Sequence, residues 1–210
     1  MHKEMTLAEV AREIHENAKA HGWWDEERET AEIYALIHGE WSEALEEYRA
    51  GRPDRWYPCE HLHYMCEENN GCKRNNPNST CIHRGAKPEG VCVELIDGVI
   101  RILDYMARSG MSEMNGSKTV GEAVHEIGFG RVKDELRWSS VPPIVNGLHL
   151  YTSLSYTMHE EVTGTERMAL INAIALAWVW IEERGLDPME LLIEKHEYNK
   201  TRPYKHGKVC

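Results

Sequence analysis

The sequence predicts an all-α fold: a helical bundle with paired carboxylate helices and a long Cys/His-containing loop inserted between them. Three observations predict this class. Apolar residues recur at the three- and four-residue spacing of a helix, several segments begin with a helix-capping sequence, and no alternating run of β-branched residues leads into a hairpin turn. The 210 residues suit one domain, 1–210, with enough apolar material for a single core.

The apolar periodicity gives the order of the helices. We expect them over residues 7–20, 27–49, 89–109, 120–137, 145–161, 166–184 and 189–200. In a capping box, a Thr oxygen and a Glu carboxylate bond to the free N–H groups of the first turn. Pairs of this kind, together with one Asp-Pro start, are Thr6 with Glu9, Thr119 with Glu122, Thr163 with Glu166, and Asp187 with Pro188.

Residues 52–87 show no helical period and are predicted to form an inserted irregular loop. The loop holds four cysteines and three histidines, which are soft ligands that zinc prefers. No two of the cysteines form a C-x-x-C pair, so the alternative is that these residues are free thiols and loop histidines. The candidate ligands of a structural zinc ion are Cys59, Cys66, Cys72 and Cys81.

The charge of the chain excludes two classes of partner. The formal net charge is −11, which argues against binding to polynucleotides and to anionic lipid surfaces. Residues 168–181 form the most apolar stretch, which is too short to span a bilayer and predicts a buried helix. The amino-terminal residues lack the apolar core of a secretion signal, so we expect a cytoplasmic protein.

Two of the predicted helices carry carboxylates three residues apart. Glu40 and Glu43 lie at the border of the apolar arc of residues 33–48, where a solvated acidic face is not expected. The helix over residues 91–106 is apolar around about two thirds of its circumference. Its narrow polar strip holds Glu94 and Asp97, followed by Arg101 and Asp104.

Buried acids are costly unless a cation or a partner compensates them. Oxygen ligands facing each other across a bundle suit a hard divalent cation such as Mg²⁺. The alternative is that Glu40 and Glu43 form a surface face, while Glu94 and Asp97 pair with Arg101.

The runs GEWSEALEEYRAG and KPEGVCVELIDGVIRILDYM resemble the paired E-x-x-E and E-x-x-D motifs of the MazG-like, all-α nucleotide pyrophosphohydrolases. The ending EKHEYNKTRPYKHGK resembles the carboxyl-terminal signature of one bacterial and phage branch, and HGWWDEER also fits. The resemblance implies a helical, usually oligomeric hydrolase of nucleotide metabolism. Such an enzyme uses Mg²⁺ (or Mn²⁺) to split a deoxy or non-canonical nucleoside triphosphate into monophosphate and pyrophosphate.

The resemblance also implies roles for individual residues. The metal ligands would be Glu40, Glu43, Glu94 and Asp97. Glu43 or Glu47 would accept a proton from the attacking water. The residues that bind the substrate phosphates would be Lys195, Asn199, Arg202 and Lys205. A base can stack on Trp23, Trp24 or Trp41.

Two other functions compete with this one. The first is a zinc-stapled helical nucleotide-binding or interaction module without turnover, and the second is a related phosphohydrolase that acts on a nucleotide-linked metabolite. Apolar central helices also favour a homodimer. The basic charge of the tail, residues 195–210, is read either as a phosphate clamp or as a solvated helix end.

Overall fold

The computed structural model describes residues 1–57, 87–113, 117–127 and 163–207. These residues form α1 (Leu7–Ala20), α2 (Thr30–Arg49), α4 (Val91–Arg108), α5 (Val120–Ile127), α8 (Thr163–Glu183) and α9 (Pro188–Lys200). Two 3-10 turns, η1 (Met111–Glu113) and η2 (Tyr204–Gly207), complete them. Within the described ranges there is no strand, only two isolated bridges. The all-α prediction is confirmed.

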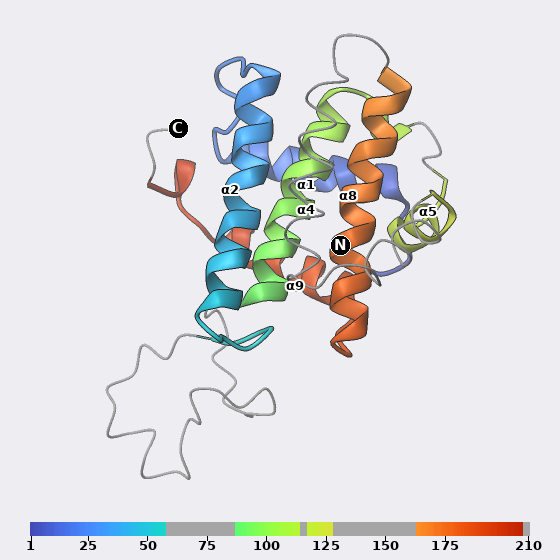
Figure 1. The fold of residues 1–210 in the computed structure, drawn as a ribbon. Helices are drawn as coiled ribbons and strands as arrows, with labels where there is room; N and C mark the ends of the chain where they lie inside the picture. The colour runs from blue at the N-terminus through green and yellow to red at the C-terminus, as the bar shows by residue number, and fades with distance from the viewer. Residues whose placement is uncertain (58–86, 114–116, 128–162, 208–210) are drawn as a thin grey trace.

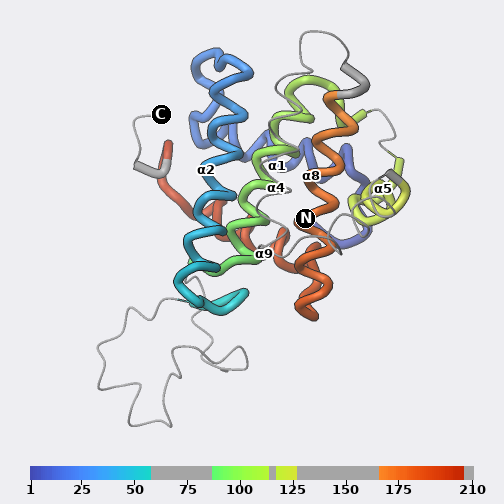
Figure 2. The backbone as a smooth tube through the Cα atoms, in the orientation of Figure 1, coloured from blue at the N-terminus to red at the C-terminus, as the bar shows by residue number. Residues whose placement is uncertain are grey.

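Three long helices, α2, α4 and α8, run side by side, and α1 and α9 cross them on one side (Figures 1 and 2). Helix α4 is central because it packs against α1, α2, α8 and α9. Twelve of its 18 residues are buried, as the apolar circumference of residues 91–106 predicts. The helix therefore brings its polar strip to an internal wall of the bundle.

Three of the described helices, α1, α5 and α9, start at the predicted caps. Thr6 forms the full capping box with Glu9, and the Asp187 carboxylate accepts bonds from the N–H groups of Met189 (2.9 Å) and Glu190 (3.0 Å). The Thr119 hydroxyl likewise accepts a bond from the Glu122 N–H at 3.2 Å. The three helices that start at these caps begin within one residue of the predicted segments.

The expected cap of Thr163 with Glu166 rests on the Thr163 side chain, which lies outside the part of the chain that the structure describes. Helix α8 begins at Thr163, and the Glu166 carboxylate accepts hydrogen bonds from the hydroxyls of Tyr34 (2.5 Å) and Tyr105 (2.9 Å). This carboxylate is buried, so its hydrogen bonds join α8 to α2 and α4 inside the core.

The contact between α2 and α4 depends on one glycine. A Cβ atom placed on Gly98 would lie 2.1 Å from Nε1 of Trp41, and the Trp41 side chain is fully buried. The glycine therefore admits the indole into the helix–helix interface. For the same reason Trp41 packs in the core and is not available to stack on a ligand, contrary to one of our expectations.

Several predictions fall outside the described residues. They are the helix over 145–161, the second half of the helix over 120–137, and the loop cysteines with any zinc they hold. In the parts of the chain that are described, no helix combines the length and apolarity needed to cross a membrane.

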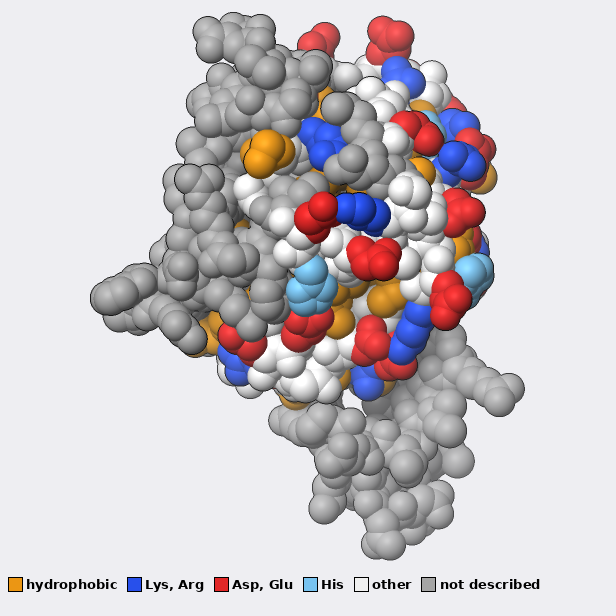
Figure 3. All heavy atoms as spheres, turned by 90° about the vertical axis from the view of Figure 1, so that its right-hand side faces the viewer, with side chains coloured by type: hydrophobic (Ala, Val, Ile, Leu, Met, Phe, Trp, Pro, Cys, Tyr) orange, Lys and Arg blue, Asp and Glu red, His pale blue; other side chains and the backbone are white. Residues whose placement is uncertain are grey.

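Charged side chains of both signs are interspersed on the molecular face shown in Figure 3. Surface ion pairs such as Lys3 with Asp187, at 2.7 Å, contribute little to stability because solvent screens them. The electrostatics that bear on function lie in a cleft between the helices.

We predict that Gly98→Ala lowers the free energy of unfolding by about 1–3 kcal/mol, because the added methyl group overpacks the contact with Trp41. Urea unfolding followed by circular dichroism measures this change. The matched control is Gly39→Ala, at a helical glycine whose added Cβ would meet open space. It should stabilise α2 by up to about 1 kcal/mol. Equal effects of the two substitutions would contradict the proposed packing.

Candidate functional site

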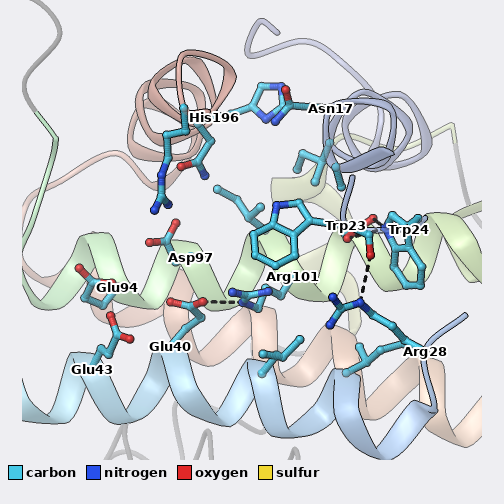
Figure 4. Close-up of a pocket in the computed structure, with 18 of the residues that line it drawn as sticks. Asn17, Trp23, Trp24, Arg28, Glu40, Glu43, Glu94, Asp97, Arg101 and His196 are labelled. Atoms are coloured by element: carbon cyan, nitrogen blue, oxygen red, sulfur yellow. Dashed lines mark hydrogen bonds and ion pairs between the residues drawn. The ribbon is translucent and has the colours of Figure 1, made fainter. Parts of the chain in front are cut away.

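A cleft between α1, α2, α4 and α9 collects six of the nine residues predicted to act in catalysis, metal binding or phosphate binding. Figure 4 shows an acidic end, formed by Glu40 and Glu43 of α2 and Glu94 and Asp97 of α4. At the other end lie the indoles of two tryptophans and the guanidinium of Arg28, and a second guanidinium lies between the ends. The cleft therefore has a carboxylate half and an aromatic, cationic half.

Three carboxylates converge at the acidic end. Glu40, Glu43 and Glu94 each present an oxygen, and these oxygens lie within 4.8 Å of one another. Glu43 is exposed, whereas Glu94 is only 3% exposed. Among the described residues, Oε2 of Glu94 has no hydrogen-bond partner.

The environment of Glu94 disfavours its charged form. Burial raises the pKa of Glu94 to about 9, and the neighbouring Asp97 acts in the same direction. A buried carboxylate beside two others, with one oxygen unsatisfied, is a costly arrangement that a divalent cation would relieve. The donor set, which consists of carboxylate oxygens from two helices, fits Mg²⁺ or Mn²⁺.

Two cations already pair with acids at this end. Arg101 donates from Nε to Glu40 at 2.5 Å, and Nζ of Lys195 lies 2.8 Å from Asp97. The alternative in which Arg101 pairs with Glu94 and Asp97 is therefore not the arrangement found. Asp97 is held by Lys195 and stands outside the group of three converging carboxylates.

Lys195 occupies a different position from the one expected of a phosphate ligand. Its side chain is 1% exposed, and Nζ also donates to the carbonyl oxygen of Pro88 at 3.2 Å. The lysine is buried between α4 and α9 as the partner of Asp97.

The other residues of the tail divide into two groups. Asn199 and Arg202 line the cleft, and Arg202 forms no ion pair with any described residue. Lys205 does not line the cleft, and its backbone N–H donates to the carbonyl oxygen of His21 at 2.9 Å. The structure thus brings Arg202, but not Lys205, to the site.

Of the two candidate proton acceptors, only Glu43 belongs to the cleft. Glu47 lies one turn further along α2, and its carboxylate accepts a hydrogen bond from the indole of Trp56 at 2.9 Å. The structure therefore places Glu43 in the cleft and Glu47 outside it, although their four-residue spacing puts both on one side of α2.

The aromatic end is formed by Trp23 and Trp24. The guanidinium groups of Arg28 and Arg101 lie 5.6 and 5.9 Å from the Trp23 ring centre, which is within cation–π range. Nε1 of Trp24 donates to Asp104 at 3.0 Å.

Asp104 is a lining residue to which the sequence assigned no role. His15 Nδ1 lies 2.6 Å from its carboxylate. Burial raises the pKa of Asp104, whereas the hydrogen bonds from His15 and Trp24 and the charge of Arg101 act against this shift. The spacing of Glu94, Asp97, Arg101 and Asp104 along one helix was the signal for a continuous polar wall.

A second group of possible ligands, Glu13, His196 and Glu197, also lies within metal-binding range. Lys200 already bridges its two carboxylates, at 2.8 Å from Glu13 and 2.7 Å from Glu197. This group is compensated by the protein itself, in contrast to Glu94.

Comparisons of the chain with protein-family models, with curated proteins and with solved structures found no match.

We predict that the raised pKa of Glu94 makes stability depend on pH in the absence of divalent cations. Between pH 4.5 and about 9 the unfolded state has lost the Glu94 proton and the folded state keeps it. The free energy of unfolding therefore falls as pH rises, by at most about 1.4 kcal/mol per pH unit for one group.

Urea unfolding of the wild type and of Glu94→Gln across this range isolates the effect, because Gln mimics the protonated acid. The wild type should lose stability relative to the variant as pH rises, and excess Mg²⁺ should reduce the loss by favouring the ionised form. Parallel pH profiles of the two proteins would contradict the assignment.

Proposed function

We propose that the protein is a Mg²⁺-dependent hydrolase that cleaves a nucleoside triphosphate between its α and β phosphates. The products would be a nucleoside monophosphate and pyrophosphate. The observation that carries this proposal is the convergence of Glu40, Glu43 and Glu94 within 4.8 Å, at one end of a cleft whose other end is aromatic. The resemblance of the same residues to the paired E-x-x-E and E-x-x-D motifs supports it.

The acidic end repels a triphosphate unless a cation is present. In this proposal Glu40, Glu43 and Glu94 hold one or two divalent cations, and Lys195 orients Asp97 beside them. A bound Mg²⁺ would neutralise phosphate charge and lower the pKa of a coordinated water. The cost of burying Glu94 without a partner would then be offset by binding.

The residues of the chain supply the remaining chemistry. Glu43, which is exposed within the cleft, would accept the proton of the attacking water. The oxygen of that water forms a bond to the α phosphorus, and the bond to the bridging oxygen breaks as pyrophosphate leaves. Asn199 and Arg202 would bind the phosphates and stabilise the charge on the leaving group.

At the other end of the cleft, the base would stack on Trp23, whose ring the two guanidinium groups already face. A nucleotide would thus lie along the cleft, with its phosphates at the carboxylates. The homodimer and the cytoplasmic location expected from the sequence belong to the same proposal.

A panel of nucleoside triphosphates incubated with Mg²⁺ tests this function. At least one should yield monophosphate and pyrophosphate, and Glu43→Gln should lower kcat by about 10²–10⁴-fold because it removes the proton acceptor. Pyrophosphate and orthophosphate are quantified separately. The matched control is Glu46→Gln, because Glu46 is exposed on the same helix, does not line the cleft and pairs with Arg49 at 3.4 Å.

Release of orthophosphate in place of pyrophosphate would exclude cleavage at the α–β bond. Nucleotide binding without any turnover would favour the binding-module alternative. Equal activity of the Glu43→Gln and Glu46→Gln variants would remove Glu43 from the reaction.

A further inference from the structure

The polar wall of α4 runs the length of the cleft. Glu94, Asp97, Arg101 and Asp104 all line it, and their spacing of three, four and three residues keeps them on one helix face. Ten residues of helix correspond to about 15 Å, which is comparable with an extended nucleoside triphosphate. With the phosphates at Glu94, as the proposed function requires, the base reaches the end where Asp104 lies.

Two donors hold the Asp104 carboxylate in place. His15 of α1 lies 2.6 Å from Oδ1, and the Trp24 indole N–H lies 3.0 and 3.1 Å from the two oxygens. A carboxylate only accepts and has about four acceptor positions, so two donors leave capacity for a ligand. The side chain is 18% exposed and lines the cleft.

The other charged groups of this end are already engaged. Arg28 donates to the carbonyl oxygen of Trp23 at 3.0 Å and pairs with Glu32, and Arg101 is bonded to Glu40. Asn17 also lines the cleft, but its amide can accept or donate and does not discriminate by itself. Asp104 is therefore the fixed acceptor that a base edge meets here.

We propose that Asp104 is a specificity-determining residue that accepts a hydrogen bond from the exocyclic amino group of the nucleobase. The site would then favour adenine, cytosine or guanine nucleotides over the deaminated counterparts, hypoxanthine, uracil or xanthine nucleotides. Deamination replaces the amino donor by a carbonyl oxygen, which would face the carboxylate as a second acceptor. This inference rests on the proposed function for the placement of the phosphates.

The experiment measures kcat/KM for three matched pairs: ATP with ITP, CTP with UTP, and GTP with xanthosine triphosphate. For the pair that the wild type hydrolyses best, the amino nucleotide should be preferred by about tenfold or more. Asp104→Asn should reverse the preference, because its amide oxygen can still accept from Trp24 while its NH₂ group donates to a carbonyl. Asp187→Asn makes the same change at the N-cap of α9, where Asn also caps, and should keep the wild-type ratio.

A wild-type ratio near one overturns the inference and leaves the proposed function standing. An Asp104→Asn variant that loses activity equally on both members of a pair also overturns the inference, since loss of a purely structural residue would lower both activities alike. Should Asp104→Asn fail to fold, the wild-type ratio alone decides.

If the wild type hydrolyses no triphosphate, the proposed function fails. The inference is then decided by the Kd values of AMP and IMP, CMP and UMP, and GMP and XMP, measured by quenching of tryptophan fluorescence. A preference for the amino member supports it, and equal affinities overturn it.

Discussion

The packing of the Trp41 indole against Gly98 sets the distance between α2 and α4, and the candidate site depends on that distance. The indole is fully buried and any side chain at residue 98 would collide with it. Glu40 and Glu43 lie on either side of Trp41 in the sequence, and Asp97 directly precedes the glycine. A contact made for packing thus brings carboxylates of two helices within 4.8 Å of one another, which neither helix could achieve alone.

The same closeness creates an electrostatic cost that is compensated unevenly. Arg101 pairs with Glu40 and Lys195 pairs with Asp97, but Glu94 has a raised pKa and an oxygen with no partner in the described part of the chain. Groups of this kind concentrate at functional sites because the arrangement serves binding at the expense of stability. For ligand binding, the net charge of −11 therefore matters less than the local distribution of charge. Glu94 lies at one end of the cleft, and Arg202 lines the same cleft.

The helices themselves could be predicted, because apolar spacing and caps such as Thr6 with Glu9 are local signals. Helix α1 matches its prediction residue for residue, and both acids of the E-x-x-E pair converge with Glu94, the first acid of the E-x-x-D pair. The pairing of Lys195 with Asp97 could not be predicted, since it depends on how α9 crosses α4. Glu166 shows the same limit: its carboxylate accepts hydrogen bonds from tyrosines of α2 and α4, and no local pattern indicates these partners. Asp104 has no local motif, and only the three-dimensional structure places His15 and Trp24 on its carboxylate.

The central claim is that the three converging carboxylates form a divalent cation site. Electron paramagnetic resonance tests it most directly, because free Mn²⁺ gives a strong signal that is lost on binding. The wild type should bind Mn²⁺ saturably and release it to excess Mg²⁺, whereas a double variant, Glu43→Gln with Glu94→Gln, should bind at least tenfold more weakly, the order expected when ligand carboxylates are removed. Equal binding by the two proteins, or no binding by the wild type, would contradict the account.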